Sequence, residues 1–181
     1  TLLHLVEQRR RVVDDKTRFT NRLGYALKQY FPQALDWFDH TDTIVFCDFL
    51  TRWPTLLQVK RARATSVRAF FWSHNVRYVN VIDERIQAIK LARPLTQDVA
   101  VITAYRLQAL VLVDQLRVTL QAIDRFDAQI AEIAPTLPDY ALFKSSPGAG
   151  ARWRGGCAHP RNLPWREHQQ LDTAPPAAVP W

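Results

Sequence analysis

The sequence has little glycine, little cysteine and no methionine. Only five of its 181 residues are glycine, which disfavours a turn-rich all-β fold. The two cysteines, Cys47 and Cys157, form no Cys-x-x-Cys or Cys/His ligand pattern, so neither a disulfide scaffold nor a structural zinc site is expected, and a reducing cytosol is the expected compartment. Uninterrupted apolar runs such as Ala109–Val113 are far shorter than the roughly 20 residues of a membrane span, so no membrane partner is expected.

The beginning of the chain carries neither a methionine nor a secretory signal. Its first eleven residues already include Glu7 and the run Arg9–Arg11, with no apolar stretch of signal length. The chain also opens in what its spacing indicates is the middle of a helix. These features predict an incomplete coding region or a trimmed chain, although removal of an initiator would look the same.

The composition indicates a folded and basic protein. Hydrophobic residues make up 48% of the chain and the formal net charge is +7, so wholesale disorder is excluded. The positive charge is uneven: residues 56–77 carry five Lys or Arg and no acid, whereas residues 94–140 carry three Arg and six acids. The basic character is therefore concentrated in the earlier segments.

Apolar residues at helical spacing predict several helices in the first half of the chain. In the first, Arg9 and Lys16 interrupt the apolar stripe, and Pro32 ends the segment. A second helix is expected to stop before Trp53-Pro54, and a fourth before Arg93-Pro94. The predicted helices are approximately 1–30, 43–50, 56–72 and 79–92.

The clearest predicted element is one long helix over residues 96–134, which contain neither Gly nor Pro. A heptad register runs through it, with nine of eleven seam positions apolar and Arg106 and Asp127 as the exceptions. At 1.5 Å per residue the helix would reach roughly 58 Å, which argues for a coiled coil or a long hairpin and for self-association through 96–134. Thr96 followed by Asp98 is a plausible start signal.

Together these patterns predict an all-α fold, a helical hairpin or coiled-coil bundle with one long helix. Three regions are expected: a helical coiled-coil region over 1–134, the start of another domain over 135–150, and an irregular, disordered or frame-shifted tail over 151–181. Prolines and tryptophans are concentrated in that tail, and no helical or strand period survives there.

Residue patterns typical of catalysis or metal binding are missing. There is no phosphate loop and no nucleophile elbow, and the five histidines show no ligand spacing. Asp36, Asp39 and Asp42 follow a helix end and are expected to keep a loop solvated, while Cys47 in an apolar run is expected to be a core residue. We therefore predict no catalytic residue, no metal ligand, no cofactor and no small-molecule substrate for this chain.

Two groups of basic residues are candidates for contact with phosphate backbones. The alternative is a solvated helix face with ion pairs such as Glu7–Arg11. A Ser-Pro-Gly-Ala-Gly stretch adds a turn resembling that of helix-hairpin-helix elements, whose glycines expose backbone amides to a phosphate. The candidate nucleic-acid-binding residues are Arg9, Arg10, Arg11, Arg18, Arg22, Lys60, Arg61, Arg63, Arg68, Gly148 and Gly150.

Several stretches occur in an order that resembles a known family: 5–11 (LVEQRRR), 21–23 (NRL), 30–35 (YFPQAL), 49–56 (FLTRWPTL) and 137–150 (LPDYALFKSSPGAG). The series resembles the middle of the bridge-RNA-guided insertion-sequence transposases, over about residues 1–150. That resemblance implies a RuvC-like domain with four acids, then a coiled-coil region, then a transposase domain with a serine nucleophile. It also implies DNA and guide RNA as partners, Mg²⁺ for the complete enzyme, and a cytoplasmic, nucleoid-associated location in bacteria.

This sequence departs from the family pattern at both ends. The four acids would precede Thr1, Ser146 stands where the family has leucine, and the helix and serine-bearing region expected after Gly150 are missing. The resemblance therefore implies a transposase fragment, for DNA transposition and recombination, that is inactive alone. The alternatives are a stand-alone helical interaction or self-association protein, and a decayed reading frame without selected function.

Overall fold

The computed structural model of the chain describes residues 2–136, 138 and 140. Within these residues it contains α-helices, one short 3₁₀ turn at Ala134–Thr136 and no strand, so the predicted all-α fold is confirmed. The predicted turn containing Gly148 and Gly150 and the tail 151–181 lie outside the described residues. The helices are α1 (Leu2–Tyr30), α2 (Gln33–Asp36), α3 (Ile44–Arg52), α4 (Leu56–Arg61), α5 (Ala64–Ser73), α6 (Val79–Leu91) and α7 (Val99–Ile133).

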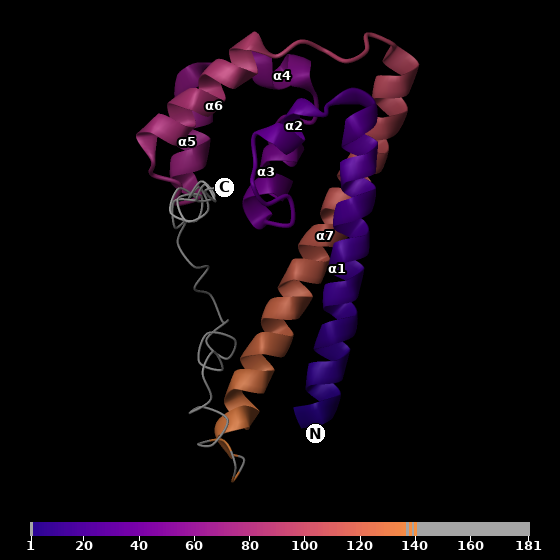
Figure 1. The fold of residues 1–181 in the computed structure, drawn as a ribbon, viewed down its shortest axis with the longest axis vertical. Helices are drawn as coiled ribbons and strands as arrows, with labels where there is room; N and C mark the ends of the chain where they lie inside the picture. The colour runs from indigo at the N-terminus through magenta and orange to yellow at the C-terminus, as the bar shows by residue number, and fades with distance from the viewer. Residues whose placement is uncertain (1, 137, 139, 141–181) are drawn as a thin grey trace, which may run out of the picture.

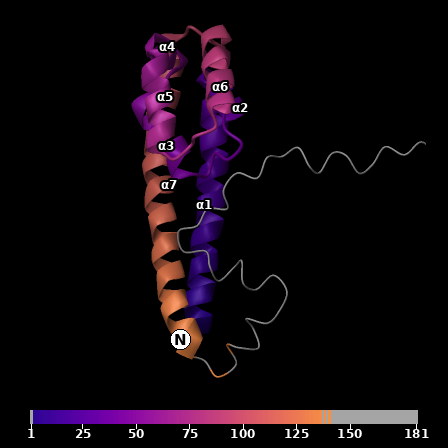
Figure 2. The same ribbon diagram turned by 90° about the vertical axis from the view of Figure 1, so that its left-hand side faces the viewer.

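The two longest helices, α1 and α7, form an antiparallel hairpin (Figures 1 and 2). The 35 residues of α7 correspond to a rod of about 52 Å, so the predicted long helix is confirmed. Its seam residues Ala109, Val113 and Leu116 are buried in the core of the same chain. The heptad pattern therefore describes, at least in part, a contact with the chain's own α1.

Three of the polar interruptions of the two apolar stripes bind a side chain of opposite charge in another part of the chain. Arg9 of α1 forms an ion pair with Asp127 of α7, and its Nη2 donates a second hydrogen bond to Oδ2 at 3.0 Å. Lys16 Nζ donates to Asp42 Oδ2 at 2.7 Å. Although partial burial by itself would raise the pKa of Asp42, the bond and charge of Lys16 lower it overall. The charges of Arg9, Asp127 and Lys16 are tolerated at these positions because each has a partner.

The start of α7 differs from the predicted one by three residues. Asp98 is the N-cap: its Oδ1 accepts from the backbone amides of Ala100 at 2.8 Å and Val101 at 3.4 Å. The hydroxyl of Thr96 instead accepts from the amide of Asp98 at 3.1 Å, two residues earlier. Both residues of the predicted start signal are thus used, and the carboxylate begins the helix.

Helices α2 to α6 form a head that packs on the upper half of the hairpin (Figure 1). Its core is aromatic: the ring centroids of Phe38 and Phe49 are 4.9 Å apart, and those of Phe49 and Trp53 are 5.4 Å apart. Edge-to-face and tilted pairs of this kind contribute beyond their buried area. The head is joined to α1 by the hydroxyl of Tyr30, which donates to the carbonyl of Pro54 at 3.0 Å.

The prediction of one helix over 56–72 is wrong. Ala62 and Arg63 are extended, with ψ near 142° in both, and separate α4 from α5. Both short helices pack on α6, one before and one after the extended pair. No Gly or Pro marks the bend, because packing rather than local propensity determines it. The short helix α2, which follows Pro32, was also not predicted.

Candidate nucleic-acid interface

The first predicted basic group lies on α1, and four of its five members are bound to acids. Arg9 is paired with Asp127, and the others have partners within α1: Arg10 with Glu7 and Asp14, Arg11 with Glu7, and Arg18 with Asp15. Arg22 is exposed and makes no ion pair among the described residues. Over most of this group the structure shows the ion-paired helix face that the sequence offered as the alternative.

The pairs within α1 have helical i,i+3 or i,i+4 spacing and remain solvated. Arg10 Nη2 lies 2.9 Å from Glu7 Oε1, and its Nη1 lies 3.2 Å from Asp14 Oδ2. The hydrogen bond from Arg10 is the main reason that the pKa of Glu7 is lowered. Such pairs cancel much of the local positive field, so a phosphate approaching α1 would compete with carboxylates already in place.

The second predicted basic group lies in the head and is less neutralised. Arg68 forms an ion pair with Asp83 of α6. Lys60 Nζ donates to a backbone carbonyl, that of Ala92, at 2.6 Å, so its charge is not cancelled by an acid. Arg61 and Arg63 are exposed and make no ion pair within the described part of the chain. Three of the four members therefore keep an uncompensated charge.

Two further cations, which sequence reasoning missed, join this group. The bond from Lys60 to Ala92 brings the end of α4 to the end of α6, where Lys90 and Arg93 are exposed (Figure 1). The sequence signal was available, because segments 49–82 and 85–97 contain no acid. We name this set the head-end cation cluster: Lys60, Arg61, Arg63, Lys90 and Arg93.

The cluster is carried by packed elements. Val59 of α4 and Ile89 of α6 are both buried in the same core, one residue before Lys60 and Lys90 respectively. The side chain of Gln33 donates to the carbonyl of Arg93 at 2.6 Å, which also holds the chain after α6. Rigid placement matters for binding, since charges that are already positioned lose less conformational entropy when a phosphate arrives.

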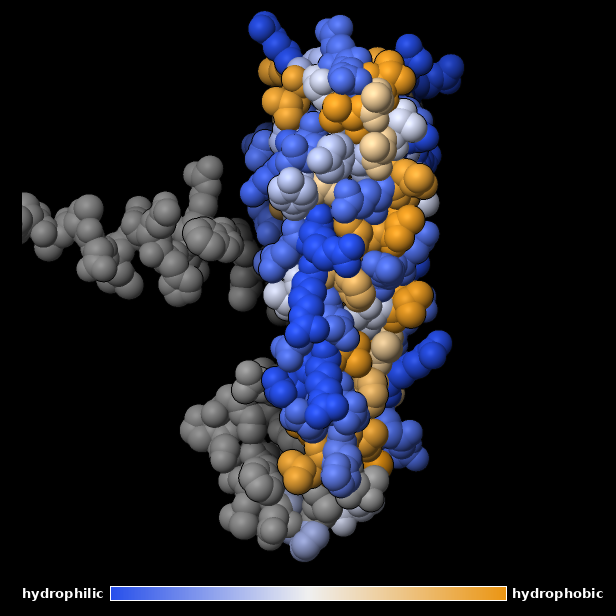
Figure 3. All heavy atoms as spheres, turned by 90° about the vertical axis from the view of Figure 1, so that its right-hand side faces the viewer, coloured by the Kyte–Doolittle hydropathy of each residue, from blue (hydrophilic) through white to orange (hydrophobic). Residues whose placement is uncertain are grey.

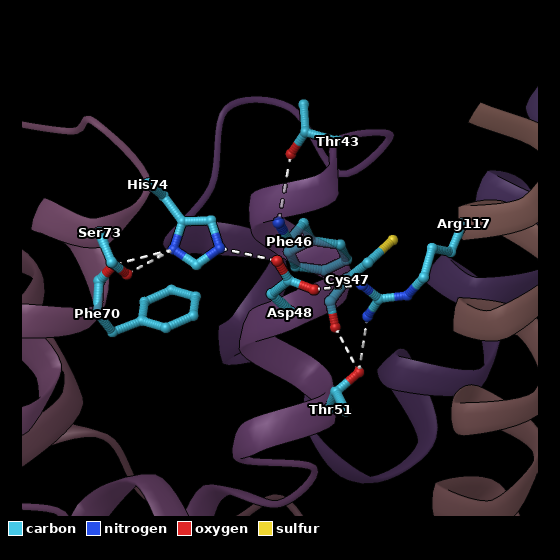
Figure 4. Close-up of polar contacts among 9 residues, drawn as sticks. All are labelled: Thr43, Phe46, Cys47, Asp48, Thr51, Phe70, Ser73, His74 and Arg117. Carbon is cyan, nitrogen blue, oxygen red and sulfur yellow. Dashed lines mark hydrogen bonds and ion pairs between the residues drawn. The ribbon is translucent and has the colours of Figure 1, made fainter. Parts of the chain in front are cut away.

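A polar network ties the head to the hairpin (Figure 4). Asp48 of α3 lies between His74, whose Nε2 is 2.8 Å from Oδ2, and Arg117 of α7, which bonds to Oδ1. Burial alone would raise the pKa of Asp48, but the bonds from His74 and Arg117 lower it overall. The other ring nitrogen of His74, Nδ1, is 2.9 Å from the carbonyl of Phe70. One carboxylate thus connects α3, α5 and α7.

The outward face of α7 is apolar and uncovered. Leu107, Val111 and Val118 are 64%, 49% and 66% exposed, and they share a face with Ala104, Gln115 and the exposed Asp114, so the strip is apolar around one charged side chain. Figure 3 shows apolar side chains beside hydrophilic ones on the side of the hairpin that faces away from the head. Segment Val99–Thr136 is also long and apolar enough to cross a membrane by length and composition, a property shared by the core helices of soluble proteins.

The acids singled out as loop residues do not assemble into a metal site among the described residues, where no group of three potential ligands is found. Asp42 binds Lys16, and Asp39 lies 3.7 Å from Arg85.

Comparisons with protein-family models, with curated proteins and with solved structures find no match for this chain. The functional argument therefore depends on the residues themselves.

Proposed function

We propose that this chain is a non-catalytic, nucleic-acid-binding helical segment of an insertion-sequence transposase, of the bridge-RNA-guided type that its sequence resembles. The observation that carries the binding is the head-end cation cluster, five exposed cations from two acid-free segments brought together by the Lys60–Ala92 bond. DNA and guide RNA are the proposed partners, in the bacterial cytoplasm. Cleavage and its Mg²⁺ are assigned to other parts of the complete enzyme, so the chain alone neither cuts nor joins DNA.

The test is the affinity for duplex DNA and for RNA measured between about 50 and about 200 mM salt. If all five cations contact phosphates, the slope of log K against log salt is about −4.5 on duplex DNA, a loss of about 500-fold over that range. A protein whose arginines serve only solubility and ion pairing shows little binding at either salt concentration.

A matched pair of triple variants tests the location. Lys60→Gln, Arg61→Gln and Arg63→Gln together should weaken binding. They should also make the slope of log K against log salt on duplex DNA less steep by about 2.7, the value for three phosphate contacts. Arg10→Gln, Arg11→Gln and Arg18→Gln together remove the same charge from the ion-paired face and should change both quantities much less. Equal effects of the two triple variants would refute the assignment to the head.

Self-association through 96–134 is a second candidate function, favoured by the exposed apolar side chains of the strip on α7. Because the seam is largely occupied within the chain, we place the contact on Leu107, Val111 and Val118, against the same strip of a second copy. Sedimentation of Val111→Asp against wild type tests it: the variant should be monomeric at concentrations at which wild type dimerises. A wild type that stays monomeric but floats with lipid vesicles would assign the strip to a membrane surface instead.

A further inference from the structure

The turn that ends α5 has a defined geometry. Asn75 has a φ of 60°, and its amide donates to the carbonyl of Trp72 at 3.0 Å, while the amide of Val76 donates to the carbonyl of Phe71 at 3.0 Å. These two bonds and the left-handed residue are the Schellman motif, with Asn in the place usually taken by Gly. Val76 packs on the core, so the motif reverses the chain sharply and brings Arg77 back beside the end of α5.

Beside that reversal lies a hollow of about 490 Å³, and the described residues that border it are Trp72, Ser73 and Arg77. Trp72 is 54% exposed, although large aromatic side chains are on average highly buried. Trp37 and Trp53, by contrast, are 7% and 6% exposed within the aromatic core. The hollow is half open to solvent, and the indole borders it.

We propose that this hollow binds one base of a single-stranded nucleic acid, with the base stacked on Trp72 and its phosphate on Arg77. The indole face supplies stacking and the guanidinium supplies charge. The hydroxyl of Ser73 donates its proton to the carbonyl of Phe70 at 2.7 Å, so its oxygen is left to accept a hydrogen bond from the base. The inference rests on the proposed nucleic-acid binding and adds the form of the ligand. A base inside a duplex is stacked on its neighbours and cannot enter the hollow.

The electrostatic surroundings suit an anion. No acid occurs between Asp48 and Asp83 in the sequence. Asp83 is bound to Arg68, and Asp48 is shared between His74 and Arg117 (Figure 4). The carboxylates that flank this segment are thus both occupied by cations, and Arg77 makes no ion pair in the part of the chain that the structure describes.

The hollow and the head-end cation cluster lie at opposite ends of one helix. Arg63 is the N-cap of α5 and Trp72 is in its last turn, so nine residues at 1.5 Å each place them about 14 Å apart along the helix axis and about half a turn apart around it. A single strand a few nucleotides long can therefore contact the cluster with its phosphates and reach Trp72 with a base. Duplex nucleic acid would use the cluster alone.

The test compares Trp72→Ala with wild type for binding of a fluorescein-labelled uridine oligonucleotide and of an RNA duplex of the same length, at about 50 mM salt. Loss of one stacked base costs about 1–3 kcal/mol, so single-strand affinity should fall roughly 5- to 150-fold while duplex affinity is unchanged. Trp72→Phe should keep most of the affinity. Arg77→Gln should make the slope of log K against log salt for the single strand less steep by about 0.7, the value for one phosphate contact. The matched control is Tyr25→Ala, which removes another exposed aromatic side chain, 60% exposed, from α1.

Several outcomes would overturn the inference. If Trp72→Ala and Tyr25→Ala have the same effect, or if Trp72→Ala weakens duplex and single-strand binding equally, the hollow is not a base site. A cluster variant that loses all binding, with Trp72→Ala binding like wild type, would leave the proposed function standing and refute only this inference. Failure of wild type to bind either probe would refute both.

Discussion

Removing Arg9 from the hairpin leaves the carboxylate of Asp127 without its partner at a seam position of α7. The Asp127 side chain is only 16% exposed and that of Arg9 is 36% exposed. Two hydrogen bonds join them. The bond to Asp127 is also the main cause of the raised pKa of Arg9. The pair therefore lies between a surface ion pair, worth about 0.2–1 kcal/mol, and a buried one, whose disruption costs about 3–5 kcal/mol.

Because Arg9 is more than one-third exposed, solvent screens the pair. We therefore expect a coupling energy of about 1 kcal/mol, at the top of the range for surface ion pairs and well below that for buried ones. Arg9→Ala or Asp127→Ala should lower the free energy of unfolding by about 1–2 kcal/mol, or the melting temperature by about 3–6 °C. A double-mutant cycle in urea isolates the pairwise part from the lost packing of the arginine stem.

Arg18 and Asp15 provide the matched control, since their 3.0 Å ion pair is formed by side chains 74% and 50% exposed. Their coupling should be about 0.3 kcal/mol. If both cycles give the same coupling energy, burial does not distinguish the pairs and the argument for Arg9 is wrong. A coupling near zero for Arg9 and Asp127 would have the same consequence.

Three further predictions concern the head and the start of α7. The pKa of Asp48 is lowered in the folded state, so its stabilising contribution is complete above the unfolded pKa of about 3.9 and is lost as pH falls through the folded value. In Asp48→Asn, the midpoint of urea unfolding should therefore fall less steeply with decreasing pH than in wild type. An unchanged pH dependence of the midpoint contradicts this prediction. Burial raises the pKa of the Cys47 thiol to about 11, so mass spectrometry should find Cys47 alkylated at pH 8 only after urea is added, not in the native protein. Asp98→Ala should lower the unfolding free energy by about 1 kcal/mol, whereas Asp98→Asn, which keeps an acceptor oxygen, should not.

The helices with strong 3.6-residue periodicity were predictable, and their partners were not. The stripes of α1 and α7 follow from spacing alone, because burial along one face imposes that period. The same stripes showed Arg9 and Asp127 only as two separate interruptions. That they meet depends on the antiparallel register of the hairpin, a contact across 118 positions that no local pattern encodes.

The head was less predictable for a related reason. Ala62 and Arg63 have no breaker chemistry, yet both are extended because α4 and α5 each pack on α6. For the candidate site, composition predicted a basic group containing Lys60, Arg61 and Arg63, whereas the fold is what brings the end of α6, with Lys90 and Arg93, to the end of α4. The charge count could not separate Arg10, whose charge is compensated, from Arg61, whose charge is not, because pairing depends on the atoms beside each guanidinium.

The difference in ion pairing between α1 and the head follows from where the acids lie. On α1 the acids Glu7, Asp14 and Asp15 are within one turn of the arginines, so pairing forms with the helix itself and needs no tertiary contact. In the head, segments 49–82 and 85–97 have no acid of their own, and within the described residues only Arg68 and Arg85 form an ion pair with a carboxylate, on Asp83 and Asp39. The other cations there have no carboxylate partner among the described residues, although Lys60 binds the carbonyl of Ala92 and Arg52 lies over the ring of Trp53. That difference, rather than the net charge, is the physical reason to place nucleic acid on the head.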